Sequence, residues 1–235
     1  MKSPFILFAH RNARGENPLI SHPSILTNLE MNVLSEKTLA AANHKCRAIY
    51  SVASGVPVVF LHGFSYTSGV WQRISVTELL MEKRVPFLAL DMPYGLKSEC
   101  RPKTHDTETN VNVAHEAVQS IFGASTPVLV GASAGGHVAL SYAARFPVKG
   151  LLLVAPARAL EEDLAHAYGK FQFPVRIIWG SEDNIISGED MRTLAGRLPN
   201  AKLTVYEGAR HSAYIDQPDR FKRELLELYV AAEQT

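Results

Sequence analysis

The pentapeptide Gly131-Ala132-Ser133-Ala134-Gly135 decides the fold, since it joins an apolar run at 127–130 to a helical pattern at 136–145. A serine between two glycines at a strand-to-helix junction is typical of a nucleophile elbow. The turn is so tight that Cβ atoms two positions before and after the serine would clash, and the glycines remove them. We therefore predict that the turn lifts the Ser133 hydroxyl above the strand end, with a helix N-terminus beneath it.

From Pro57 onward, short apolar runs alternate with helical patterns. The expected strands are 58–61, 86–90, 128–130, 148–154, 175–179 and 203–206. The expected helices are 76–83, 106 or 107 to 122, 136–145, 160–168, 189–198 and 219–232. Continuously apolar strands separated by helices predict an α/β fold with a mostly parallel sheet covered on both faces. Right-handed crossovers then bring the loops after the strands to one edge of the sheet.

The first part of the chain has a different pattern. Residues 37–52 fit two strands joined near Asn43-His44, which predicts an antiparallel hairpin at the sheet edge. Residues 1–30 contain four breakers and little periodicity, so we expect an N-terminal extension outside the core, with poor order as one alternative. The expected catalytic domain is 31–235, and Met31 raises the hypothesis of a shorter functional product that starts there.

Composition narrows the class of protein. The 235 residues suit one domain, and 24 Lys plus Arg against 23 Asp plus Glu argue against nucleic acid as a partner. Cys46 and Cys100 lack metal-ligand spacing, which favours reduced thiols in a cytoplasmic protein. The apolar run at 5–9 is too short for a signal peptide, and no run approaches the roughly 18 residues of a membrane helix. We expect a soluble protein without a membrane partner.

Two side chains complete the chemistry that a serine nucleophile needs. A serine hydroxyl is a weak nucleophile unless a base accepts its proton and a carboxylate orients that base. Asp183 follows the strand expected at 175–179, and His211 follows the strand at 203–206, which gives the order Ser, Asp, His that accompanies this elbow. Glu182 is the rival carboxylate, and an aspartate after a strand is often only a turn former. Gly-x-x-Asp after a strand favours Asp183.

An oxyanion hole is the second requirement, because the tetrahedral intermediate carries a negative oxygen that backbone N–H groups stabilise. One donor is the residue after the nucleophile, Ala134, and the other lies in the loop that follows the strand at 58–61. Within that loop we assign the Phe64 N–H as the donor. His62 is better explained as a brace for the loop than as a base, because His211 already fits that role.

Together these segments resemble the α/β-hydrolase superfamily, in particular small serine hydrolases of the esterase and lipase type. The matching segments are His62-Gly63-Phe64, Asp91-Met92-Pro93, Gly131 to Gly136, Trp179 to Asp183 and Gly208 to His211. The likeness extends from about Glu36 to the C-terminus. One departure concerns Tyr94 and Leu96, which stand where relatives often carry glycines, so this loop is expected to have its own shape near the pocket.

The segment between the strands at 148–154 and 175–179 holds one helix at most, so we expect no cap domain and an open site. Without a lid to move, small soluble esters are favoured over lipid droplets. Tyr66, Tyr94 and Tyr214 are our candidates for substrate binding, and Phe64, Trp71 and Leu96 extend that set. An equally weighted alternative places Trp71 and some of these aromatic side chains in the core.

The resulting hypothesis is a carboxylic-ester hydrolase that works through an acyl-enzyme on small-molecule esters. Hydrolysis of thioesters, amides, lactones or C–C bonds and acyl transfer share the same machinery. A non-catalytic interaction scaffold is the less favoured class, because such members usually lack a triad position. The glycines around Ser133 lack the P-loop lysine and the dinucleotide spacing, which excludes those nucleotide sites. No metal or cofactor is expected, and the oligomeric state, a homo-oligomer included, stays open.

Overall fold

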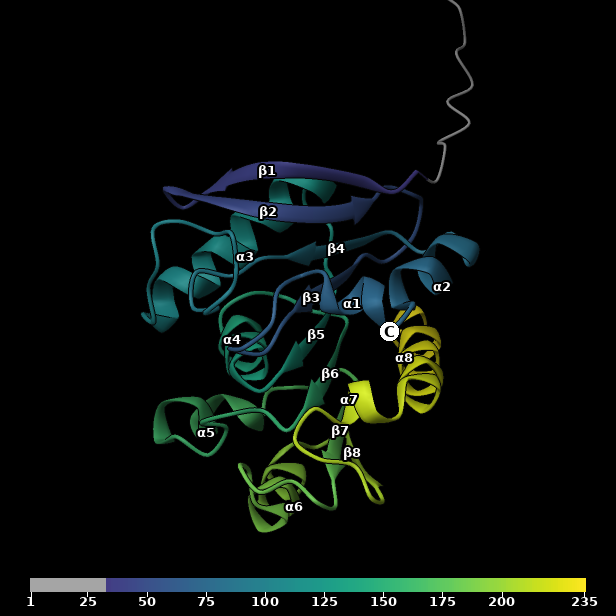
Figure 1. Ribbon diagram of the computed structural model, residues 1–235. Coiled ribbons are helices and arrows are strands. Elements are labelled where there is room, and N and C mark those ends of the chain that lie inside the picture. The colour runs from purple at the N-terminus through teal and green to yellow at the C-terminus, as the bar shows by residue number, and fades with distance from the viewer. Residues whose placement is uncertain (1–32) are drawn as a thin grey trace, which may run out of the picture.

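Eight strands form one sheet in the computed structural model, which describes residues 33–235. Their order across the sheet is β1-β2-β4-β3-β5-β6-β7-β8 (Figure 1). The strands are β1 (Ser35–Ala41), β2 (His44–Ser51), β3 (Val58–Leu61), β4 (Phe87–Leu90), β5 (Val128–Ala132), β6 (Gly150–Val154), β7 (Val175–Gly180) and β8 (Ala201–Tyr206). The pairs β1–β2 and β2–β4 are antiparallel and the other neighbours are parallel, so the nucleophile strand β5 lies in the middle of the sheet.

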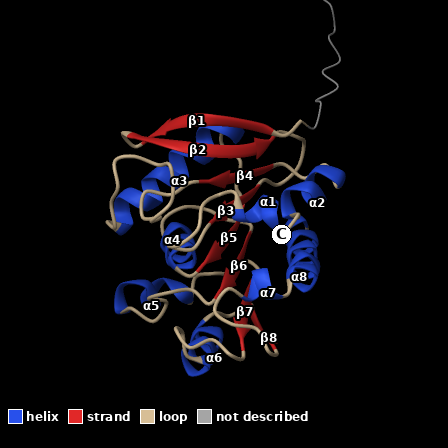
Figure 2. Cartoon of the chain, viewed as in Figure 1, coloured by secondary structure: helices blue, strands red, loops and turns tan. Residues whose placement is uncertain are grey.

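Helices separate most of the strands and cover both faces of the sheet (Figure 2). They are α1 (Val70–Arg73), α2 (Val76–Glu82), α3 (Thr107–Phe122), α4 (Ala134–Ala143), α5 (Glu162–Tyr168), α6 (Gly188–Arg197), α7 (Ala213–Asp216) and α8 (Pro218–Glu233). Asp106 caps α3 as the sequence predicts, since its carboxylate accepts the Thr109 N–H at 2.7 Å. The short helices α1 and α7 have no counterpart in the prediction, because four residues are too few to show a periodic pattern.

The sheet separates two hydrophobic cores. Side chains alternate between its faces, so Leu129 belongs to one core while Val128 and Val130 belong to the other. Helices α3, α4, α5 and α6 pack on the first core, and α1, α2, α7 and α8 pack on the second, as Figure 1 shows on either side of the sheet. Burial on both faces explains why β3, β4, β5 and β6 read as continuously apolar runs.

Two predictions about the sheet and its covering are confirmed. The hairpin β1–β2 lies at the sheet edge, and its pairing places Ala41 opposite His44. Only α5 lies between β6 and β7, so no cap domain covers the described part of the chain. Within residues 33–235, none of the helices has the length and apolar character needed to cross a membrane. The predicted extension 1–30 and the hypothetical start at Met31 lie outside the described residues.

The expectation of two reduced thiols is wrong, because Cys46 and Cys100 form a disulfide. Lys45 and Arg101 exchange two backbone hydrogen bonds of 2.8 and 3.0 Å, which places the adjacent cysteines side by side. The two cysteines are 54 residues apart in sequence, so no local pattern shows that they meet. A disulfide gives no support for the cytoplasmic location that reduced thiols would favour.

Candidate active site

Ser133 occupies the elbow between β5 and α4 with the backbone strain that its position predicts. Its φ of 50° lies in the left-handed region, which residues other than glycine rarely adopt. A Cβ on Gly131 would lie 2.5 Å from the Gly135 carbonyl oxygen, so the predicted crowding within the turn is confirmed. A Cβ on Gly135 would instead lie 2.1 Å from the Leu61 carbonyl oxygen. This glycine therefore lets α4 pack directly against the loop after β3.

Asp183 and His211 form a hydrogen-bonded pair at the ends of β7 and β8. The distance between His211 Nδ1 and Asp183 Oδ2 is 2.8 Å. The Asp183 side chain is fully buried, and its other oxygen accepts the N–H groups of Ile185 and Ile186. These bonds leave His211 Nδ1 as the donor and Nε2 as the nitrogen that can accept a proton. The rival Glu182 is exposed, so the geometry favours Asp183 as the orienting carboxylate.

A cavity of about 240 Å³ brings Ser133 and His211 together. Its walls come from the loop after β3, from the elbow, and from the loops after β7 and β8. Two of the three tyrosines expected to bind substrate, Tyr66 and Tyr214, line it beside Phe64. Tyr66 is held by a 3.1 Å hydrogen bond between its hydroxyl and that of Ser212. We name this hollow the catalytic cavity.

The loop after β3 lies directly against the nucleophile, since a Cβ on Gly63 would be 3.8 Å from Ser133 Cβ. The fully buried His62 ring braces this loop, because Nδ1 donates to the Gly63 carbonyl at 2.8 Å and Nε2 accepts the Met92 N–H at 3.0 Å. Burial lowers the pKa of His62, so the ring is neutral with its proton on Nδ1. Both nitrogens are occupied, which confirms the bracing role predicted for His62.

The loop after β4 fixes the remaining carbonyls of the β3 loop. The Tyr94 hydroxyl donates to the His62 carbonyl at 2.5 Å, and the Leu96 N–H donates to the Phe64 carbonyl at 2.8 Å. Burial raises the pKa of Tyr94 well above its usual value, so this hydroxyl stays protonated. Because the C=O and the following N–H of a trans peptide point in opposite directions, these bonds also fix where the Gly63, Phe64 and Ser65 N–H groups point.

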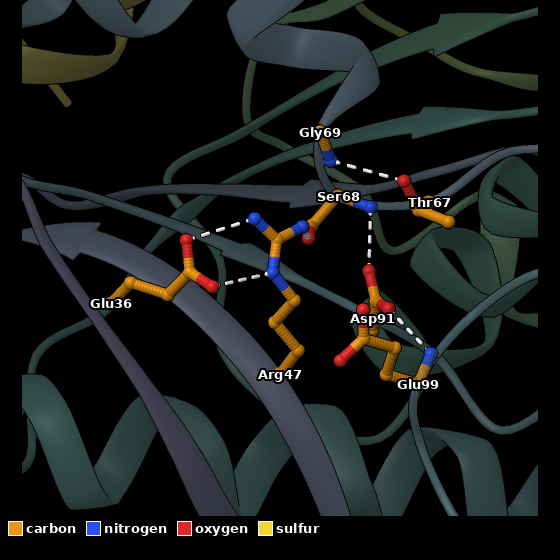
Figure 3. Close-up of polar contacts among 7 residues, drawn as sticks. All are labelled: Glu36, Arg47, Thr67, Ser68, Gly69, Asp91 and Glu99. Atoms are coloured by element: carbon orange, nitrogen blue, oxygen red, sulfur yellow. Dashed lines mark hydrogen bonds and ion pairs between the residues drawn. The ribbon is translucent and has the colours of Figure 1, made fainter.

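A polar cluster ties the β4 loop to the N-terminal hairpin (Figure 3). Buried Asp91 accepts the Ser68 and Glu99 N–H groups at 2.6 Å each, and its own N–H donates to the Arg47 carbonyl. The Arg47 guanidinium donates to both carboxylate oxygens of Glu36, at 2.7 and 2.8 Å, and to the Ser68 hydroxyl at 3.3 Å. The edge hairpin therefore supports the loops that reach the active site.

The other candidates for substrate binding, Trp71, Leu96 and Tyr94, lie outside the catalytic cavity. Trp71 is fully buried and stacks on Tyr214 at 5.0 Å, so the core alternative holds for it. Leu96 is 62% exposed and lines neither of the cavities beside Ser133, so it does not belong to the pocket. Tyr94 lines a second cavity of about 160 Å³, which shares Phe64 with the catalytic cavity and also contacts Ala134.

Sequence reasoning missed three residues of this second cavity, His105, His137 and Arg158. They come from three separate segments, and none belongs to a motif that marks it as functional. Within residues 33–235, His, Cys, Asp and Glu side chains form no group of three or more that could hold a metal ion.

Three features define the class of protein. They are a central, mostly parallel sheet, a serine at the turn after the middle strand, and an aspartate and a histidine on loops at one edge of that sheet. The chain belongs to the alpha/beta hydrolase family, whose family model matches residues 58–176, just over half of the chain.

Individual relatives lead to the same family. The chain is 31% identical to Protein ABHD14A of Danio rerio over 173 residues, which cover 72% of this chain and 63% of that relative. It is 28% identical to the "Putative protein-lysine deacylase ABHD14B" of Rattus norvegicus, with 72% of this chain and 81% of that protein covered. The chain thus spans less than two thirds of the ABHD14A relative's length.

Solved structures share the fold at low sequence identity. A predicted CIB-like hydrolase from Thermoplasma acidophilum superimposes with a TM-score of 0.74 at 22% identity, covering 83% of this chain and 97% of its own. The esterase EaEST from Exiguobacterium antarcticum gives 0.71 at 18% identity, covering 82% and 98%. At these identities the likeness concerns the fold alone.

Proposed function

We propose that this protein is a serine hydrolase that cleaves carboxylic esters of small soluble substrates through an acyl-enzyme. The observation that carries the proposal is one cavity lined by both Ser133 and His211, with His211 Nδ1 2.8 Å from the buried Asp183 carboxylate. A strained serine beside an oriented imidazole is the arrangement that activates a hydroxyl as a nucleophile.

In this proposal, Ser133 Oγ attacks the ester carbonyl while His211 Nε2 accepts the hydroxyl proton. Asp183 holds the imidazole in the tautomer that leaves Nε2 free and stabilises the imidazolium. The Phe64 and Ala134 N–H groups donate to the oxyanion, and Ala134 is available because the first N–H groups of a helix lack intrahelical acceptors. His211 then protonates the leaving alcohol, and a water molecule activated by the same imidazole releases the acid and restores Ser133.

Labelling with a fluorophosphonate tests this proposal. We expect covalent modification of the wild type at Ser133 and none of Ser133→Ala, together with hydrolysis of short p-nitrophenyl esters by the wild type alone. An unlabelled wild type that turns over no ester would favour the non-catalytic scaffold instead.

Amide hydrolysis is the second candidate, because the rat ABHD14B relative carries lysine deacylase in its name. An acyl-lysine amide would use the same nucleophile and base, with an amine as the leaving group in place of an alcohol. Comparing kcat/KM for an acetyl-lysine peptide with that for a matched acetyl ester distinguishes the two candidates, since a larger value for the peptide would replace our first choice. The same comparison of kcat/KM can be extended to thioesters, lactones, substrates with a cleavable C–C bond and acyl acceptors. It then tests the remaining candidate reactions.

The partner of the site is, in this proposal, a small-molecule ester. The proposal includes neither nucleic acid nor a membrane as a partner. The near balance of 24 basic and 23 acidic residues supports the omission of nucleic acid. A cytoplasmic location stays a prediction from the sequence, and the Cys46–Cys100 disulfide argues against it.

A further inference from the structure

The second cavity beside Ser133 has no role in the proposed chemistry so far. Phe64 lines both this cavity and the catalytic cavity, and Ala134 lines the second one. The two residues assigned as oxyanion donors therefore both contact the second cavity. A substituent on the carbonyl carbon of a bound ester would therefore lie next to this cavity.

Tetrahedral geometry decides which group that is. The carbon of the intermediate bears Ser133 Oγ, the oxyanion, the leaving oxygen and the acyl chain. The oxyanion lies with the Phe64 and Ala134 N–H groups, and the leaving oxygen must reach His211, which lines the catalytic cavity. The acyl chain is the remaining substituent, and the second cavity is the space left for it.

The two cavities differ in charge. The catalytic cavity is lined by uncharged side chains and His211. The second cavity has an apolar wall that includes Phe64, Tyr94 and Val138, and its exposed rim carries His105 and Arg158. Among the residues that the structure describes, no aspartate or glutamate lines it. Such a lining accepts an apolar chain and favours a negative charge at the chain's far end.

Arg158 is held at this rim by the backbone. The N–H of the preceding residue, Ala157, donates to the Ser133 carbonyl at 3.0 Å, which ties the loop after β6 to the elbow. Arg158 itself has a φ of 53°, a conformation that residues other than glycine rarely adopt. The hydrogen bond of Ala157 holds this strained backbone in place. The Arg158 side chain therefore leaves the loop at a fixed position on the rim.

The charge of Arg158 is available to a ligand. Its partner Glu161 lies 2.6 Å away, but the side chains are 57% and 41% exposed, and exposed ion pairs contribute little to stability. The His137 ring does not supply positive charge, because burial lowers its pKa and the nearby Arg158 lowers it further. Arg158 is therefore the cation that a carboxylate in this cavity would meet, in the planar geometry that guanidinium groups offer.

We propose that the second cavity holds the acyl group of the substrate and that Arg158 selects acyl groups ending in a carboxylate, such as those of dicarboxylic acid monoesters. This inference rests on the proposed ester hydrolysis and adds the class of acyl group to it.

Four esters of six-carbon acyl chains test the charge and its position. Monobenzyl adipate carries a carboxylate on the acyl side, benzyl hexanoate carries none, benzyl 6-aminohexanoate carries a cation, and 4-carboxybenzyl hexanoate carries its carboxylate on the alcohol. We expect kcat/KM for monobenzyl adipate to exceed that for benzyl hexanoate about tenfold, as one charged hydrogen-bonded contact provides. The cationic ester should be the poorest, and the alcohol-side carboxylate should give no advantage.

Opposite substitutions in the Arg158–Glu161 pair sharpen the test. Arg158→Gln should lower kcat/KM for monobenzyl adipate about tenfold and so abolish its advantage over benzyl hexanoate, and Glu161→Gln should increase that advantage about twofold to threefold by freeing the guanidinium. Arg145→Gln is the matched control, since Arg145 forms an exposed pair with Glu108 outside the cavity. High salt should reduce the preference.

Two results would overturn the inference. If the wild type has an equal or larger kcat/KM for benzyl hexanoate than for monobenzyl adipate, the cavity does not recognise a carboxylate at the end of the acyl chain. If Arg158→Gln keeps the preference for monobenzyl adipate, a group other than Arg158 recognises that carboxylate. If no ester is hydrolysed above the Ser133→Ala background, the proposed function itself fails, which is a separate outcome.

Discussion

The two halves of the site, one on either side of Ser133, are built in opposite ways. The half that we propose to hold the oxyanion, named the oxyanion half, comprises the loops after β3 and β4, and its polar groups, including His62, Asp91 and Ser98, are buried and hydrogen-bonded. The half that we propose to move the proton, named the acid–base half, comprises the loops after β7 and β8, where the Asp183 side chain is buried while Glu182, Asn184 and Ile185 are exposed.

In the proposed mechanism, this difference follows from the task of each half. An oxyanion hole stabilises developing charge best when its dipoles are fixed before the reaction. A general base must instead gain and lose a proton in each cycle, which requires access to substrate and water. In the oxyanion half every carbonyl from His62 to Phe64 accepts a hydrogen bond, while among residues 33–235 nothing is hydrogen-bonded to His211 Nε2, and the His211 side chain is 18% exposed.

The largest expected effect is in the acid–base half. His211→Ala should reduce kcat by about 10⁴- to 10⁶-fold, and Asp183→Asn by about 10⁴-fold, because the base or its tautomer is lost. Steady-state kinetics with short p-nitrophenyl esters, with circular dichroism to show that the variants fold, measure this. A folded His211→Ala variant that keeps most of the wild-type kcat would contradict the assignment of His211.

Two glycines offer a matched test of both halves. A Cβ on Gly135 would lie 2.1 Å from the Leu61 carbonyl oxygen, and one on Gly180 would lie 2.3 Å from the Ala209 carbonyl oxygen. Gly135→Ala should displace the oxyanion loop and Gly180→Ala the His211 loop. Each should lower kcat/KM about 10²-fold and cost about 1–3 kcal/mol of unfolding free energy.

Gly196→Ala is the control for this pair, because a Cβ there meets nothing within 4 Å and the residue lies inside α6. It should leave activity unchanged and raise stability by about 0.5–1 kcal/mol. Urea denaturation together with kcat/KM measures all three variants. Full activity in Gly135→Ala would show that the oxyanion half is more adaptable than its contacts indicate.

A smaller effect is expected where the oxyanion half is held by one hydroxyl. Tyr94→Phe removes the bond to the His62 carbonyl and should lower kcat about tenfold with little change in KM, less than the roughly 10²–10³ lost with a direct oxyanion donor. Tyr168→Phe is the control, because that buried hydroxyl also donates to a backbone carbonyl, of Ala159, at 2.6 Å.

Both tyrosine variants should lose about 1 kcal/mol of stability, the usual contribution of one hydrogen bond. Only Tyr94→Phe should change kcat. Equal kinetic effects of the two substitutions would mean that Tyr94 acts through general stability and has no positioning role.

The smallest effect is expected at the outer edge of the oxyanion half, in the cluster of Figure 3. Arg47→Gln breaks the bidentate pair with Glu36 and the contact with Ser68. It should cost about 1 kcal/mol in urea denaturation, because the pair is partly exposed, and change kcat/KM less than threefold. A tenfold kinetic loss would show that the hairpin positions the catalytic loops more strongly than proposed.

The sequence predicted the elements of this fold more completely than their contacts. Continuous apolar runs, the hairpin near Asn43-His44 and the cap at Asp106 are local patterns, and each appears where it was expected. The sequence also predicted the elbow, because the strained turn is formed by five consecutive residues. The short helices α1 and α7 were missed, because a single turn shows no period.

By itself, the sequence determined the order of strands and helices and the candidate residues Ser133, Asp183 and His211, because periodicity and motif spacing are properties of neighbouring residues. Only the tertiary structure decided that Cys46 meets Cys100 and that Tyr94 holds the His62 carbonyl. It also decided that His105 and Arg158 share a cavity with Phe64. These contacts join residues far apart in the chain, and they exist only once the packed sheet brings its loops to one edge.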